Sequence, residues 1–268
     1  VPNAIKENIK RDLRKYSVAG IVPEILDLKY LYLETESKVY YNTSLAANAM
    51  TVQAQILNNI NRLAASAELN KYGARFKYSK FLKVIDQSHE AITSNVTTVE
   101  MRRDLRLAVD QFAEYAIDFG NQFHISSMSG FNIRSSAFKV LDIPNTVYLY
   151  DIPNADGSTG SLGLFSLDSP GSTTPLIERS NVGIVNYNTG RMTLNPINIV
   201  SGKTKDGQQI MEISVVPESN DVIGLQDLYL QLDTSNVEMI IDEIASGADP
   251  SGSTYTVTSS YTDRKIIR

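Results

Sequence analysis

Hydrophobic positions in the first hundred residues follow two different periods. Apolar residues at three- and four-residue spacing predict a short helix from Ala4 to Tyr16 and a longer one from Leu45 to Leu69. Alternation of apolar and polar residues predicts strands between Ile21 and Tyr41, with a turn at Glu36-Ser37-Lys38. The elements expected next are a strand at 74–78, a helix at 80–90 that Ser79 caps, and a strand at 95–102.

After residue 104 the pattern changes to short alternating runs separated by Gly, Pro, Asn, Asp and Ser, which is typical of an antiparallel sandwich or distorted barrel. Val182–Leu194 predicts a hairpin in which Gly190 takes a positive φ, and Asp206-Gly207 predicts a two-residue hairpin turn. The Gly/Ser/Thr-rich segment near 154–175 predicts a mobile loop.

The predicted fold class is therefore α+β, because strands and helices are interleaved only in the first part of the chain. Residues 1–104 form a strand–long helix–strand–helix–strand unit in this prediction. Residues 105–268 form a mainly antiparallel β domain.

Composition excludes several classes of protein. A chain of 268 residues with 42% hydrophobic and 21% charged residues is typical of a globular protein that buries a core. No apolar run approaches the roughly 18 residues that span a bilayer, and no signal peptide is recognisable, so we expect no membrane insertion. The absence of cysteine excludes disulfides and thiolate chemistry.

Charge is distributed unevenly along the chain. Residues 1–105 contain 15 Lys and Arg against 11 Asp and Glu, whereas residues 106–268 contain 10 against 19. One interpretation is that each half is simply solvated. The other is that oppositely charged faces of neighbouring copies or partners attract each other, in which case the contact weakens with salt.

None of the motifs that suggest chemistry is complete. Ser201–Thr204 resembles the end of a phosphate-binding loop, but the required earlier glycine is Ile197. The two histidines have no companion nucleophile, which favours structural or exposed roles. We therefore expect no enzyme, cofactor, metal or small-molecule substrate. We also considered a calcium-binding loop formed by Asp151, Asp156 and Asp168. These residues lack EF-hand spacing, so we do not expect them to bind calcium.

Basic and aromatic residues interleave between positions 71 and 83. This combination suits single-stranded nucleic acid, since cations contact phosphates and rings stack on bases. On a strand, however, Phe76 and Tyr78 share the face opposite Arg75. The rings then point into the core, and the charged groups lie at its solvent-exposed edge. A pI near 5.2 also disfavours nucleic acid. The residues that remain as a candidate protein interface are Lys71, Arg75, Lys77, Lys80 and Lys83.

Four segments, taken in order, resemble the baseplate wedge subunits of T4-like contractile-tailed phages, within the baseplate J-like family. They are the unit from Glu24 to Arg102, the run Tyr115–Asn121, the hairpin Val182–Leu194 and the run Val216–Val222. Each motif alone is a common hairpin or turn, and their order and spacing carry the resemblance. The chain is similar to the C-terminal portion of such a subunit, and we expect that N-terminal sequence is missing from it.

The resemblance implies a structural protein without catalytic residues. It implies a homodimer that assembles with other baseplate wedge proteins and links wedges into a ring around the tail hub. The implied location is the virion tail baseplate, with assembly in the host cytoplasm. Two alternatives stay open: a β-domain adhesin that binds carbohydrate through exposed aromatic rings, and a hydrolase that uses paired carboxylates.

Overall fold

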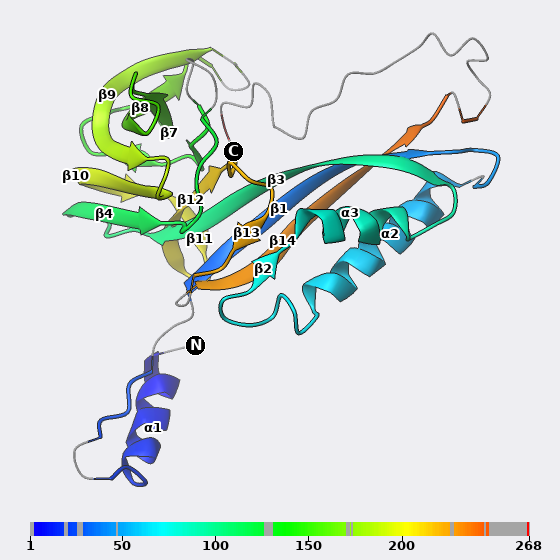
Figure 1. Ribbon diagram of the computed structural model, residues 1–268. Helices are drawn as coiled ribbons and strands as arrows, with labels where there is room; N and C mark the ends of the chain where they lie inside the picture. The colour runs from blue at the N-terminus through cyan, green and yellow to red at the C-terminus, as the bar shows by residue number, and fades with distance from the viewer. Residues whose placement is uncertain are drawn as a thin grey trace.

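The computed structural model describes residues 3–18, 21–25, 29–46, 48–125, 131–169, 172, 174–225, 228–243, 245–246 and 267. The chain opens with helix α1 (Asn3–Arg14), which lies apart from the rest of the molecule (Figure 1). The short helix predicted from Ala4 is thus confirmed. The remaining described elements form two six-stranded sheets, a small two-stranded sheet and two further helices.

The first sheet is built on two long antiparallel strands, β1 (Lys29–Tyr41) and β3 (Ile92–Arg106). β14 (Leu228–Ile241) pairs parallel with the outer side of β1. Because β1 is paired along both sides, it continues straight through Glu36–Lys38, and the turn predicted there is wrong. The other members of the sheet are β12 (Gln208–Val215), β11 (Lys203–Lys205) and β5 (Arg134–Ser135), in the order β11-β12-β3-β1-β14 with β5 beside β12.

Helices α2 (Ala49–Ala64) and α3 (Tyr78–Asp86) lie on one face of this sheet (Figure 1). Their buried apolar side chains recur at helical spacing, as the sequence predicted. α2 is shorter than expected, because Asn48 caps it by accepting a hydrogen bond from Met50 N at 2.9 Å. Between the helices, β2 (Arg75–Phe76) pairs with β13 (Val222–Ile223).

The second sheet is antiparallel throughout. Its predicted hairpin is confirmed: Gly190 has φ +67° and connects the two strands of Val182–Leu194. The loop predicted near 154–175 is wrong for residues 159–167, which form an interior strand with mostly buried side chains. The strands in order are β4 (Phe112–Asp118), β10 (Arg191–Ser201), β9 (Pro175–Asn186), β8 (Thr159–Leu167) and β7 (Val147–Pro153), with β6 (Lys139–Val140) beside β10.

One hydrophobic core extends through both sheets, from Leu31 and Met101 in the first to Leu162 and Met192 in the second. The described chain is mainly β, which fits the β-rich part predicted after residue 104, whereas the exact strand–long helix–strand–helix–strand unit stays a prediction. A division at residue 104 into two folding units stays a prediction. The first sheet takes strands from both sides of that position, because β12 and β14 complete the sheet that β1 and β3 begin.

Candidate functional site

The five basic residues that the sequence suggested as an interface lie together around β2 and α3. All five side chains are exposed. Phe76 and Phe81, which alternate with them, are buried with ring centroids 5.4 Å apart. Rings in the core cannot stack on bases, and the exposed ring of the set, Tyr72, packs edge-on against Tyr229, so this arrangement argues against nucleic acid. Arg75 belongs to β2, and Lys80 and Lys83 belong to α3. Lys71 and Lys77 lie in the segments that adjoin these elements.

One acidic residue, Glu68, lies among these cations. Its carboxylate forms an ion pair with Lys80 Nζ. The hydrogen bond from Lys80 holds the pKa of Glu68 below its ordinary value, and the charges of Lys77 and Lys71 add to the effect. Even with Glu68 and with Asp221, which lies beside Arg75, the five cations leave a net positive surface that can attract an acidic partner.

A polar hollow of about 400 Å³ opens beside Arg75. Asp221 lines it and accepts a hydrogen bond from the backbone N–H of Tyr78 at 2.7 Å. Tyr78 is the first residue of α3, so Asp221 caps this helix from a distant part of the chain, and the predicted Ser79 cap is wrong. The other lining residues are Gly120, Asn121, Gln122, Ser219 and Ile223.

Asn121 links its own run, Tyr115–Asn121, to the hairpin Val182–Leu194 and to Ile223, which directly follows the run Val216–Val222. Its side-chain amide donates to the carbonyls of Phe119 and Ile223, each at 2.9 Å, and its Oδ1 accepts from Ile223 N at 2.9 Å. Gly190 packs directly against the Asn121 carbonyl, where a Cβ has no room. Segments that lie far apart in the sequence therefore meet in space around Asn121.

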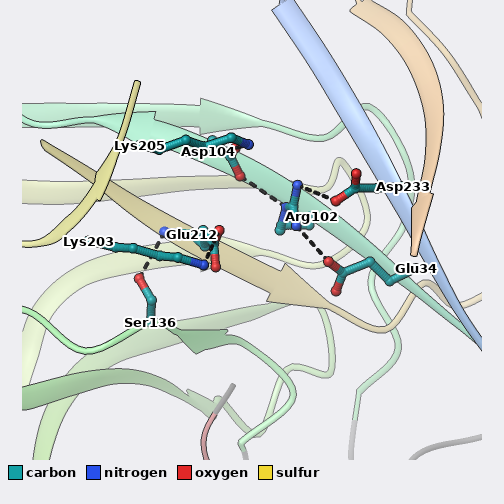
Figure 2. Close-up of polar contacts among 8 residues, drawn as sticks. All are labelled: Glu34, Arg102, Asp104, Ser136, Lys203, Lys205, Glu212 and Asp233. Atoms are coloured by element: carbon teal, nitrogen blue, oxygen red, sulfur yellow. Dashed lines mark hydrogen bonds and ion pairs between the residues drawn. The ribbon is translucent and has the colours of Figure 1, made fainter. Parts of the chain in front are cut away.

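A buried charge cluster that sequence reasoning missed is centred on Arg102 of β3 (Figure 2). The Arg102 side chain is 5% exposed. Nη1 lies 2.7 Å from Glu34 Oε1 on β1, and Nη2 lies 2.7 Å from Asp233 Oδ2 on β14. Nε lies 3.0 Å from Asp104 Oδ1, at ion-pair distance but without the alignment of a hydrogen bond. Arg102 thus reaches across β1 to connect three strands.

A β-bulge aims Asp233 at this cluster. Leu232 pairs with Leu33 and Thr234 pairs with Glu34, so that Asp233 is the extra residue on β14. Bulges of this kind redirect a side chain out of the regular alternation. Charged residues at alternate positions 102 and 104 of β3, which therefore lie on one side of the strand, were the signal that the sequence offered.

Tyr32 covers the cluster with its ring. The guanidinium carbon of Arg102 lies 4.2 Å from the ring centroid and Lys205 Nζ lies 5.0 Å from it, which are cation–π geometries. Burial raises the pKa of Tyr32. Burial by itself lowers the pKa of Lys205, but its 2.6 Å contact with Asp104 outweighs this and raises the pKa.

The carboxylates in Figure 2 all face cations, including Glu212, whose Oε1 lies 2.8 Å from Lys203 Nζ. These ion pairs connect strands of the first sheet and so cross-link it.

The rejected ligand candidates do not converge. Asp151 is buried and accepts hydrogen bonds from Tyr187 Oη and Ile133 N, each at 2.7 Å, and burial raises its pKa. Asp156 lies in an exposed turn, where hydrogen bonds, first from the Thr159 hydroxyl, lower its pKa to about 2. Within the described residues, no group of three or more His, Asp or Glu could hold a metal ion.

The remaining motifs also have structural roles. Gly202 N donates to Gln209 Oε1 at 2.9 Å in the β11–β12 hairpin, where the incomplete phosphate loop was considered. His89 Nδ1 accepts from Ala91 N, and His124 Nδ1 lies 3.0 Å from Glu218 Oε2. In the part of the chain that the structure describes, no helix is long and apolar enough to cross a membrane.

Comparison with known proteins relates the chain to phage baseplates. Residues 29–104, which contain β1, α2, β2, α3 and most of β3, match the family model of the baseplate structural protein gp6, C-terminal domain III. The chain is 25% identical over 164 residues to baseplate wedge protein gp6 of Enterobacteria phage T4. That alignment covers 59% of this chain and 24% of the relative, so the chain corresponds to a limited part of its length. These similarities support a structural, baseplate wedge type of protein.

Proposed function

We propose that this chain is a structural component of a contractile phage tail baseplate and contributes to linking wedges into a ring around the tail hub. The observation that carries the proposal is the combined match to gp6 domain III and to baseplate wedge protein gp6. The cross-linked charges around Arg102 and the junction at Asn121 suit a component that bears mechanical load. The comparisons favour this role over the adhesin and hydrolase alternatives.

In this proposal the chain self-associates as a dimer and contacts other wedge proteins in the virion tail baseplate, after assembly in the host cytoplasm. The exposed cations around β2 and α3 form one contact surface, and they attract acidic faces of a second copy or a partner. The opposite net charges of the two halves of the chain support this contact.

Sedimentation velocity of the purified chain at several concentrations and salt levels tests self-association. We expect the average mass to rise with concentration and to fall as salt increases, because salt screens exposed charges. A chain that stays monomeric at high concentration and low salt contradicts the dimer.

A variant with two charge reversals tests whether the contact involves the cations around β2 and α3. The double variant Lys77→Glu with Lys83→Glu should weaken association by at least tenfold. The control carries the same change of charge at exposed positions elsewhere, Lys38→Glu with Lys139→Glu, and should associate nearly as the unaltered chain does. Equal effects of the two doubles would show that only total charge matters.

A further inference from the structure

Exposed apolar side chains are concentrated at the start of the chain. Of the eighteen large hydrophobic residues exposed in the described structure, seven lie between residues 5 and 22. Ile5, Ile9 and Leu13 form one stripe of α1, and each is between 46% and 48% exposed. A helix of twelve residues is marginal in water by itself, since most helix stability in proteins comes from packing of the apolar face. Another surface is therefore needed to cover this stripe.

The charge of α1 indicates what that surface is like. Lys6 and Lys10 each follow a stripe residue, so they border the stripe along one side. Residues 3–15 carry five cations and two acids. A complementary surface is apolar at its centre and acidic at its margin.

The outer face of the second sheet has this character. Ala116, Thr193 and Ile184 form a row across β4, β10 and β9, and Ile184 is 64% exposed. Phe112, 68% exposed, lies on the same side of β4. Glu114 and Asp118 lie on that side too and are exposed; Arg191 pairs opposite Asp118, and Arg103 Nη1 donates to the Asp118 carbonyl.

This face also has no helix layer among the described residues. α2 and α3 cover the first sheet, whereas α1 extends away from both sheets of its own chain (Figure 1). Sheets with one apolar face toward the core and a second partly apolar face are stable when a helix packs on that second face. The chain thus presents an uncovered basic helix and an uncovered, partly apolar sheet face that carries the carboxylates of Glu114 and Asp118.

We propose that α1 of one copy docks on the outer face of β4, β10 and β9 of a second copy. The inference rests on the proposed self-association and adds a second pair of surfaces to the contact proposed around β2 and α3. Reciprocal docking of two α1 helices gives a two-fold dimer, in which each copy supplies both the helix and the sheet face. Lys6 and Lys10 then lie near the carboxylates of Glu114 and Asp118.

Cross-linking between singly substituted chains tests the contact directly, because the chain has no cysteine of its own. A chain with Ile9→Cys is mixed with a chain with Ile184→Cys and treated with a short bismaleimide. We expect a covalent pair of the two different chains at a yield at least fivefold above that of the matched control, in which Asn8→Cys replaces Ile9→Cys. Asn8 is exposed and lies off the stripe.

Either of two other cross-linking results would overturn the inference. A dominant product between two Ile9→Cys chains would show that α1 pairs with α1. A cross-link within single chains that carry both Ile9→Cys and Ile184→Cys, at a yield independent of dilution, would show that α1 docks on its own sheet.

Sedimentation separates failure of this inference from failure of the proposed function. Ile9→Ser with Leu13→Ser should raise the dissociation constant at least tenfold, whereas Asn8→Ser should leave it within twofold. If the unaltered chain associates and the stripe variant associates equally well, the docking inference is wrong and self-association stands. If the unaltered chain is monomeric throughout, both are wrong.

A membrane is the competing partner for a basic amphipathic helix. Vesicles of phosphatidylethanolamine and phosphatidylglycerol provide the probe. We expect the unaltered chain to stay in the supernatant after the vesicles are pelleted. Pelleting that the stripe variant abolishes would assign α1 to a lipid surface and overturn docking on a second copy.

Discussion

Replacing Arg102 by methionine is the sharpest test of the buried charge cluster. Methionine keeps the stem of the side chain and removes the cation that faces Glu34, Asp104 and Asp233. The carboxylates of Glu34 and Asp104 are 17% and 14% exposed, so water cannot fully replace the guanidinium. The variant leaves buried negative charge without its partner.

The magnitude follows from this geometry. Removing one partner of a buried ion pair costs about 3 to 5 kcal/mol. Loss of three carboxylate contacts and of the stacking on Tyr32 raises the cost, whereas two features lower it. Asp233 is 33% exposed and regains hydration, and Lys205 still lies 2.6 Å from Asp104. We therefore expect the free energy of unfolding to fall by about 3 to 4 kcal/mol.

Urea unfolding followed by circular dichroism measures this change. Arg102→Lys should give an intermediate loss, because one ammonium group cannot reproduce the three directions of a guanidinium. The control is Arg106→Met on the same strand, where the side chain is exposed and a change within about 0.5 kcal/mol is expected. If Arg102→Met and Arg106→Met had equal effects, the cluster would contribute no net stability and the reasoning would be refuted.

Three further predictions concern the junctions and the core. Gly190→Ala should lower the unfolding free energy by at least about 2 kcal/mol, because a Cβ at φ +67° meets the Asn121 carbonyl. The control, Gly157→Ala, has a similar φ of +64° but open space around it and should cost about 1 kcal/mol. Similar shifts of the melting temperature for both variants would contradict a contact at Gly190. Asp221→Ala should remove the cap of α3 and cost about 1 kcal/mol in urea unfolding, and no loss would show that water replaces this carboxylate. Burial raises the pKa of Asp151, so its contribution to stability is present below the ordinary carboxyl pKa and is lost as pH rises through the folded-state pKa. Asp151→Asn should therefore gain stability relative to the unaltered chain as pH rises from 4 to 8, and a constant difference would refute the assignment.

Local patterns in the sequence determined several elements correctly. The apolar stripe of α1 is visible as a helical period, and the hairpins at Gly190 and Asp206-Gly207 follow from residues that tolerate positive φ. Both features depend on neighbours within a few residues. The opposite directions of Arg75 and Phe76 were also predictable, since strand alternation separates them.

Predictions failed where the outcome depended on distant partners. The segment near 154–175 has the composition of a loop, yet part of it becomes β8 because β7 and β9 supply hydrogen bonds on both sides. Glu36–Lys38 has turn-like residues, but pairing with β3 and β14 keeps it extended. The α3 cap is supplied by Asp221, 143 positions away, and no local signal indicates it.

The sequence alone thus determined the β-rich character, the amphipathic first helix, the tight turns and the lack of a complete catalytic or metal-binding motif. Only the tertiary structure decided which charges are buried together and which landmarks meet. Arg102, Glu34 and Asp233 lie on three strands, and a bulge of one residue sets the direction of the last carboxylate. Periodicity describes the direction of a side chain relative to its own strand. Electrostatic pairing depends on distances between strands, and those distances exist only after the sheet has formed.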